Sequence, residues 1–253
     1  MNSHDNKQIL HKTELSSVKE PSSIAEPSFM KEPSSITEIQ DLISAQISLI
    51  THEIRNPVTL ISTYLYLMAE KHPEIREFDY WDHVTSNMEF LKVLLNDISS
   101  LNNAHTLHKE MVNIHQFLSS LTQELTPHLN QNNHTITLKK RSALPPLELD
   151  TTKFRQALLN LIRNSAEAME NGGEISISVY FKDLSIMIEI QDEGPGIPNE
   201  YLPTLFEPFV THKKEGTGLG LAIARNLLEA HGGNIRVNTS TDTGTCFILQ
   251  LPI

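Results

Sequence analysis

Residues 51–58 read Thr51-His52-Glu53-Ile54-Arg55-Asn56-Pro57-Val58 and lie in the middle of a long helical pattern. Apolar residues recur around this octapeptide every three or four positions, the spacing of one face of an amphipathic helix. They are Ile43, Ile47, Ile50, Ile54, Val58, Ile61, Leu65 and Met68. The pattern predicts a helix from Glu38 to about Glu70. It contains an extra four-residue step at Pro57, which indicates a local unwinding where this helix packs in a helical bundle.

His52 falls between Ile50 and Ile54 and therefore points off the apolar face. A histidine in such a position is usually a plain surface residue. Pro57 favours a function instead, because a proline inside a helix removes a backbone hydrogen bond at a cost of roughly 3 kcal/mol. With a carboxylate beside it (Glu53) and an amide one turn on (Asn56), the imidazole is placed to react rather than to pack.

A second helix is predicted from about Tyr80 to His105, after a break at His72-Pro73. Its apolar positions are Val84, Met88, Leu91, Leu95 and Ile98. Two such helices form an antiparallel hairpin that leaves apolar surface unburied, and pairing two hairpins in a homodimer covers it in a four-helix bundle. The alternative is a single hairpin that packs only on the C-terminal domain.

The second half of the chain mixes strands and helices. Strands are predicted at 110–114, 135–138, 147–149, 174–181, 184–191, 234–239 and 245–251, and helices at 115–130, 151–169 and 219–231. Strands mixed with helices that cover one face of a sheet indicate an α/β sandwich. The predicted fold class is therefore α plus α/β, a helical hairpin of a dimeric four-helix bundle followed by an α/β sandwich.

The composition excludes several classes of protein. A net charge of −11 argues against nucleic acid as a partner, because phosphate neutralisation needs clustered Lys and Arg. The apolar runs are far shorter than the roughly 20 residues of a spanning helix, and the N-terminus lacks a signal-peptide pattern, so no integral membrane segment is expected. The single cysteine, Cys246, lies in a strand-like run; it predicts a buried, inert thiol and a cytoplasmic protein.

Three hexapeptides with Glu-Pro-Ser at their centre repeat at 19–24, 25–30 and 31–36. Proline at every sixth residue and few large apolar groups favour disorder over residues 1–37. A docking or localisation tail is the alternative interpretation.

Two polar motifs in the second half suit a nucleotide. Asn160 and Asn164 lie four residues apart on one helix face, and a neutral amide oxygen can ligate Mg²⁺ beside a triphosphate. Asp192 ends a strand before Gly194-Pro195-Gly196, where its carboxylate can accept a hydrogen bond from an exocyclic amine while the glycines let backbone approach a base. Capping asparagines and an Asx turn are the structural alternatives.

A third motif, Gly216-Thr217-Gly218-Leu219-Gly220, opens a helix, where unpaired N–H groups favour phosphate. Residues 199–215 before it are interpreted as a mobile lid hinged by glycines and held down by Phe206 and Phe209. The two phenylalanines could equally be ordinary core residues. Arg163 could approach a phosphate or be solvated.

The segment from His52 to Pro57 resembles the H-box of two-component sensor histidine kinases. Residues 160–164, 192–197, 206–209 and 216–221 are similar to the family's N-box, first glycine box, F-box and second glycine box, in the same order. The resemblance covers about residues 41–253. It implies a dimerisation and phosphotransfer domain at 38–108 and a catalytic domain with the Bergerat-type ATP-binding fold at 109–253.

The resemblance also implies roles for residues. His52 would be phosphorylated from Mg·ATP and pass the phosphoryl group to an aspartate of a response regulator, with Glu53 serving the kinase direction and Asn56 the dephosphorylation of the regulator. Asn164 would be the Mg²⁺ ligand, and Asp192 would bind adenine. The implied nucleotide-binding residues are Asn160, Asn164, Asp192, Gly194, Gly196, Lys213, Gly216, Thr217, Gly218, Leu219 and Gly220. His212 departs from the family, where a second threonine is common.

Two other functions remain open at this point. One is a nucleotide-binding phosphotransfer scaffold without kinase activity, against which the intact Asn, Asp and Gly positions speak. The other is a chaperone or repair ATPase on the same fold. Those enzymes carry a Glu in the N-box, whereas this chain has Asn160 there.

Overall fold

The structure, a computed structural model, describes residues 36–104, 106–213, 216–240 and 243–253, and the side chains of the first helix from Leu42 onward. The tail predicted to be disordered lies outside these residues, except that residues 36 and 37 already belong to the first helix. That helix therefore begins two residues earlier than the sequence pattern predicts.

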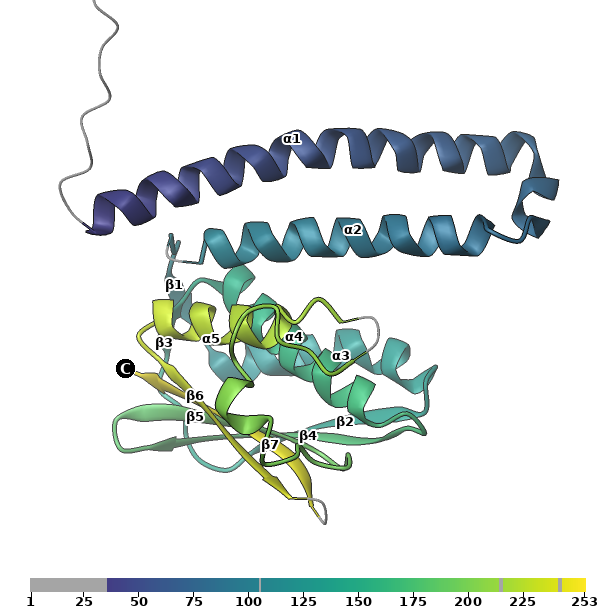
Figure 1. Ribbon diagram of the computed structural model, residues 1–253. Helices are drawn as coiled ribbons and strands as arrows, with labels where there is room; N and C mark the ends of the chain where they lie inside the picture. The colour runs from purple at the N-terminus through teal and green to yellow at the C-terminus, as the bar shows by residue number, and fades with distance from the viewer. Residues whose placement is uncertain (1–35, 105, 214–215, 241–242) are drawn as a thin grey trace, which may run out of the picture.

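A helical hairpin forms the N-terminal part of the fold (Figure 1). It consists of α1 (Ile36–Lys71), the short 3₁₀ helix η1 (Pro73–Glu77) and α2 (Trp81–Asn102). The predicted break at His72-Pro73 is confirmed, since His72 caps η1 and Pro73 opens it. Side chains join the two helices, because Arg55 Nη2 donates to Ser99 Oγ at 2.8 Å. α1 stays helical through Pro57.

The hairpin leaves much of its apolar surface uncovered. Val58 and Leu95 are buried, but Ile50, Ile54 and Ile61 are 57%, 45% and 48% exposed. These residues belong to the stripe predicted from the sequence. Two helices cannot enclose an apolar core between them, so the remaining face needs a further partner.

The second part of the fold is an α/β sandwich with a five-stranded mixed sheet. The strand order is β2 (His134–Lys140), β4 (Gly173–Lys182), β5 (Ser185–Asp192), β7 (Gly244–Pro252) and β6 (Asn234–Ser240). β2 pairs with β4 in parallel, and the other pairs are antiparallel. A separate two-stranded sheet joins β1 (Glu110–Val112) to β3 (Leu147–Leu149), so β1 is shorter than predicted.

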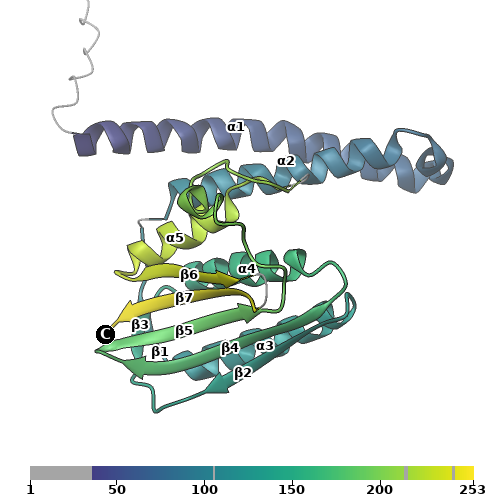
Figure 2. The ribbon, with the colours of Figure 1, turned by 60° about the horizontal axis from the view of Figure 1, so that its bottom comes forward.

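Three helices, α3 (Ile114–Asn130), α4 (Thr151–Ala168) and α5 (Gly220–Ala230), cover one face of the five-stranded sheet (Figure 2). Alternate strand residues such as Ile177, Ile188 and Leu249 are fully or almost fully buried beneath them. The core continues to Phe154 of α4, which contacts Phe117 and the buried His231 with ring centroids 5.8 and 6.0 Å apart. The α/β sandwich is confirmed.

Asp150 connects α4 to its surroundings. Its Oδ1 caps α4 by accepting from the Lys153 N–H at 3.0 Å, and its Oδ2 accepts from the His108 N–H at 2.9 Å. The Asp150 N–H donates to His231 Nε2 at 3.1 Å, while His231 Nδ1 bonds the Leu227 carbonyl at 2.7 Å. Burial lowers the pKa of His231, so the imidazole is neutral and carries its proton on Nδ1. These bonds fix α4 and α5 relative to one another.

Cys246 is half-buried and faces away from the helices, because it alternates along β7 with the buried Phe247. The buried thiol predicted from the sequence is therefore corrected to a partly covered one. Burial raises the pKa of Cys246 to about 11, with smaller contributions from Glu189 and Asp192.

We expect Cys246 to resist alkylation. At pH 8 a thiol with this pKa has a thiolate fraction roughly a hundredfold below that of a free cysteine, and only the thiolate is nucleophilic. Iodoacetamide labelling followed by mass spectrometry should be slow in the folded protein, should rise tenfold for each pH unit up to the pKa, and should become fast in denaturant. A labelling rate equal to that of a free thiol at pH 8 would contradict this expectation.

Candidate active site

The three residues of the H-box that were predicted to be catalytic lie together on α1. His52, Glu53 and Asn56 are all exposed. His52 and Asn56 are one helical turn apart and share a face, whereas side chains adjacent in sequence on a helix do not face each other. The hydrogen bonds described for this part of the chain include none between Glu53 and His52. The imidazole is thus open to solvent and to an approaching domain.

The other motifs converge around α4. A Cβ added at Gly220 would lie 3.9 Å from the Asn160 side chain, and one added at Gly194 would lie 3.4 Å from Ala168 Cβ. Lys213 reaches Asn164 directly, with Nζ 2.9 Å from Oδ1. The N-box and both glycine boxes, which are up to 60 residues apart in sequence, therefore border one site.

Asn160 and Asn164 differ in their surroundings. Asn160 is 8% exposed, and its Nδ2 has no hydrogen-bond partner among the described residues. Its Oδ1 lies 3.4 Å from Nη2 of the exposed Arg163, which also approaches Glu167 at 3.9 Å. A buried amide with a free donor costs free energy unless a ligand or water pairs it. Asn160 therefore has the capacity to bind a polar ligand.

Asp192 ends β5 and is 1% exposed. Its Oδ1 accepts hydrogen bonds from the Gly194 and Thr245 N–H groups, both at 3.0 Å. Its Oδ2 is buried and has no partner among the described residues. Oδ1 thus makes the hydrogen bond expected of an Asx turn. Oδ2 can accept a hydrogen bond from a donor such as an exocyclic amine.

Gly244 and Thr245, which the sequence reading missed, complete this corner. Gly244 has φ of 75°, and a Cβ there would lie 2.1 Å from the Asp192 carbonyl oxygen. Only glycine lets β7 approach Asp192 so closely. The signal was present as the turn residues between the last two strands, but nothing in the sequence linked that turn to Asp192.

The second glycine box immediately precedes α5, which begins at Gly220. Gly218 has φ of 67°, and a Cβ there would lie 2.7–2.8 Å from backbone atoms of Phe209 and Val210. The Phe209 N–H donates to the Gly218 carbonyl at 3.1 Å, so the F-box and the glycine box are held together. Phe206 packs against the core, but Phe209 is 64% exposed. The expectation that Phe209 packs the segment down is wrong, since its side chain lies in solvent while its backbone, at a φ of 65°, pairs with Gly218.

The segment before the glycine box is tied in two places. The rings of Tyr201 and His212 stack with centroids 3.5 Å apart, so the histidine that departs from the family pattern has a specific contact. Lys213 Nζ binds Asn164 Oδ1 at 2.9 Å and Glu167 Oε2 at 2.7 Å. Lys213, one of the implied nucleotide-binding residues, therefore contacts Asn164, the implied Mg²⁺ ligand.

The hairpin and the glycine box meet at a buried carboxylate. Thr217 Oγ1 donates to Oδ2 of Asp97 on α2 at 2.8 Å, and Asp97 is 7% exposed. Burial raises the pKa of Asp97, which the Thr217 hydrogen bond and the charge of Arg163 partly offset. A second bond, from Gln156 Nε2 to Ser100 Oγ at 2.6 Å, joins α4 to α2. Asp97 was not predicted, because an acidic residue on an exposed helix gives no local signal.

The two halves of the predicted active site are not brought together. In Figure 1 α2 lies between α1, which carries His52, and the α/β sandwich, which carries the glycine box. The roles that the family resemblance implies for them would require the sandwich to move relative to the hairpin or to act on a second chain.

The polar groups around α4 fit Mg·ATP. The free Asp192 Oδ2 and Asn160 Nδ2 and the N–H groups of the glycine box offer partners for a base and for phosphates. Mg²⁺ takes only one or two protein oxygens when phosphates supply the rest, and the Asn164 amide meets that requirement. Among the described residues, no cluster of three or more His, Cys, Asp or Glu could hold a metal by itself.

Comparison with known proteins identifies the class. Residues 149–253 match the family of histidine kinase-, DNA gyrase B-, and HSP90-like ATPases. In fold, the chain resembles the histidine kinase ThkA in its complex with the response regulator protein TrrA. The TM-score is 0.61 at 24% identity, over 85% of this chain and 63% of that one.

Within this class, the chain is similar in sequence to sensor histidine kinases. It is 32% identical over 205 residues to sporulation kinase A of Bacillus subtilis (strain 168), covering 80% of this chain and 33% of the relative. It is 30% identical over 205 residues to the sensor histidine kinase ZraS of Escherichia coli (strain K12), covering 81% and 44%. The chain thus spans a third to under a half of these relatives. None of its described helices combines the length and the hydropathy needed to cross a membrane.

Proposed function

We propose that this protein is an ATP-dependent protein-histidine kinase that phosphorylates itself on His52 and transfers the phosphoryl group to an aspartate of a response regulator. The observation that carries the proposal is an exposed imidazole off the apolar face of α1, in the same chain as an ATPase site whose N-box carries asparagine at 160. In this proposal residues 38–108 form the phosphoacceptor domain and residues 109–253 the ATP-binding domain, and the protein acts in the cytoplasm.

Each side chain then has a chemical task. The free Asp192 oxygen accepts a hydrogen bond from the adenine amine, and the glycine-box N–H groups bind the phosphates. Asn164 holds Mg²⁺, which neutralises phosphate charge during transfer. His52 attacks the γ-phosphorus through a ring nitrogen as the bond to the ADP oxygen breaks, and Glu53 stabilises the charge on the ring.

Labelling with γ-labelled ATP tests this function. The kinase should form a phosphoprotein that is stable to base and labile to acid, and the label should pass to a purified response regulator. A scaffold without kinase activity would bind ATP but take up no label. An ATPase of the chaperone or repair type would release labelled phosphate without forming a phosphoprotein. Either of the last two results would overturn the proposal.

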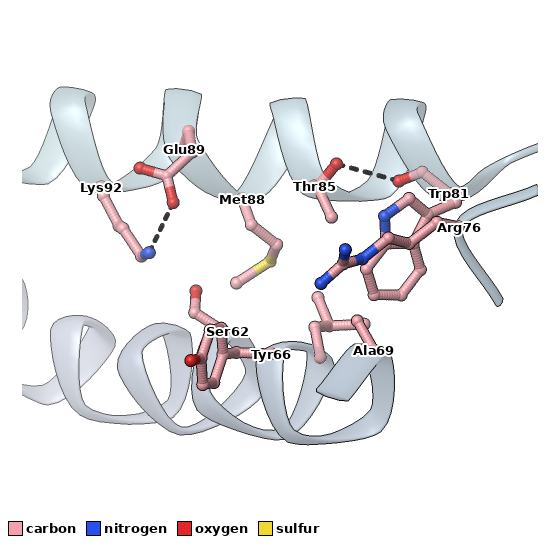
Figure 3. Close-up of a pocket in the computed structure, with 10 residues that line it drawn as sticks. Ser62, Tyr66, Ala69, Arg76, Trp81, Thr85, Met88, Glu89 and Lys92 are labelled. Atoms are coloured by element: carbon pink, nitrogen blue, oxygen red, sulfur yellow. Dashed lines mark hydrogen bonds and ion pairs between the residues drawn. The ribbon is translucent and has the colours of Figure 1, made fainter. Parts of the chain in front are cut away.

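We also infer that the active protein is a homodimer. A cavity of about 280 Å³ lies between α1 and α2 near η1, lined by Tyr66 and Ala69 of α1 and by Trp81 and Met88 of α2 (Figure 3). The exposed stripe with Ile50, described above, continues along the same helix. A second hairpin in a four-helix bundle would fill the cavity and cover the stripe.

The dimer predicts the effect of a charge in the stripe. We expect Ile54→Glu to convert the protein to a monomer, because the buried carboxylate would have no partner in the bundle. Sedimentation equilibrium should give twice the 28.5 kDa chain mass for the wild type and the chain mass for the variant. Thr63→Glu, at an exposed polar position of α1, is the control and should remain dimeric. A monomeric wild type would contradict the inference.

Asn56 and Glu53 should separate two activities. Asn56 is exposed on the face of His52 and carries no charge, so its task would be to orient a water that attacks the phospho-aspartate. Asn56→Ala should slow dephosphorylation of the regulator roughly tenfold while autophosphorylation continues, whereas Glu53→Ala should mainly slow autophosphorylation. If Asn56 only relieves the backbone before Pro57, its variant would lower the melting temperature and both rates together.

A further inference from the structure

Two side-chain oxygens of α4 contact the positively charged ammonium of Lys213. Asn164 Oδ1 and Glu167 Oε2 lie 2.9 and 2.7 Å from the Lys213 ammonium nitrogen. The two residues are three positions apart in the helix and therefore share a face. Glu167 belongs to none of the motifs recognised in the sequence, and its carboxylate is half exposed.

From this geometry we propose that Glu167 is a second protein ligand for magnesium, and that the metal and the Lys213 ammonium compete for Asn164 Oδ1 and Glu167 Oε2. The metal and Lys213 then exclude one another at Asn164 and Glu167. This inference rests on the proposed function, because it deepens the magnesium site of the kinase.

The chemistry of the two oxygens suits a hard cation. Mg²⁺ binds carboxylate and amide oxygens at about 2.0–2.1 Å, so each of the two side chains would need to draw in by less than about 1 Å. A carboxylate also supplies the negative charge that the neutral Asn164 lacks. In the absence of metal, the Lys213 ammonium at 2.7 Å balances that charge, together with Arg163, whose Nε lies 3.9 Å from Glu167 Oε1.

The contact is weak enough to exchange. Lys213 and Glu167 have 41% and 50% of their side-chain surface exposed, and ion pairs at such exposure contribute little to stability. Displacement leaves Lys213 with no carboxylate partner beside the glycine box, where the phosphates of ATP would bind. The exchange thus moves the Lys213 ammonium from the Glu167 carboxylate to the phosphates of ATP. Lys213 is paired with a negative charge in both arrangements.

Amine labelling with magnesium alone tests the exchange. Lys213 should be acetylated slowly in the nucleotide-free wild type, and millimolar Mg²⁺ should raise the rate several-fold, as measured by mass spectrometry. In Glu167→Gln the rate should be high without metal and insensitive to it. Lys182, an exposed lysine at the end of β4, is the internal control and should not respond. A Lys213 rate that is independent of Mg²⁺ in the wild type would overturn the exchange.

Nucleotide binding tests Glu167 as a ligand. In calorimetric titrations, Mg²⁺ should raise the affinity of the protein for a non-hydrolysable ATP analogue. The Mg²⁺ concentration that produces half of this increase should be roughly tenfold higher in Glu167→Gln than in the wild type, and near the wild-type value in Glu167→Asp. Affinity in EDTA should not fall. Glu170→Gln, an exposed neighbour just beyond α4, should match the wild type.

The two proposals fail separately. If Asn164→Ala loses the magnesium dependence and Glu167→Gln keeps it, Glu167 is not a ligand, while the kinase proposal stands. If the wild type takes up no label on His52, the kinase proposal fails whatever the metal titrations show.

Discussion

His52→Gln abolishes autophosphorylation and leaves ATP affinity unchanged within about twofold, the expected result if the acceptor and the nucleotide site are separate. His52 lies on α1, and α2 lies between α1 and the α/β sandwich (Figure 1). The side chain is exposed, and exposed substitutions of this kind usually change stability by less than about 0.5 kcal/mol. Glutamine keeps the helix and the polar surface but offers no ring nitrogen to attack phosphorus.

Three measurements on the same variant decide the prediction. γ-labelled ATP should give no phosphoprotein, calorimetry should give the wild-type affinity for ATP, and the melting temperature should not change. His83→Gln is the matched control, because His83 is an exposed histidine on α2. This variant should still be phosphorylated on His52 like the wild type. Persistent labelling of His52→Gln would mean that another residue is the acceptor.

Asp192→Asn weakens ATP binding by roughly 10- to 100-fold, the equivalent of about 1.5–3 kcal/mol for a hydrogen bond to a charged group. The direction follows from the two carboxylate oxygens. Oδ1 accepts from the Gly194 and Thr245 N–H groups, so an asparagine must keep its oxygen there. Its amide nitrogen then occupies the position of the free Oδ2, where a donor would meet the donor of the adenine amine.

The selectivity of the loss distinguishes recognition from damage. The variant retains both backbone bonds, so its melting temperature should stay close to that of the wild type. ATP should lose more affinity than GTP, which has no exocyclic amine at the same position of the ring. Asp183→Asn, in the exposed turn between β4 and β5, is the matched control and should bind ATP normally. Equal losses for both nucleotides would assign Asp192 a structural role only.

The helical hairpin was the most predictable part of the fold. Its apolar stripe repeats with the period of a helix, and His72-Pro73 marks the break between α1 and α2. The strands of the sandwich were also found, since β-branched residues alternate between turns. The parallel pairing of β2 with β4 was not, because pairing depends on contacts between residues about 40 positions apart.

The candidate site divides in the same way. The residue types in the boxes, such as Asn164 and Asp192, determine which chemistry is available, and they are visible in the sequence because each box is a short, local string. The partners of those residues are not local. Thr217 bonds Asp97, 120 residues away, and Lys213 bonds Glu167, 46 residues away.

By itself, then, the sequence determined an amphipathic hairpin with an exposed His52, followed by an α/β domain with the side chains of an ATP site. Only the tertiary structure decided that Asp192 keeps one oxygen free, that Phe209 is exposed, and that α2 lies between α1 and the α/β sandwich. The physical reason is that periodicity and turn chemistry act over a few residues, whereas burial and pairing of polar atoms depend on which distant segments pack together.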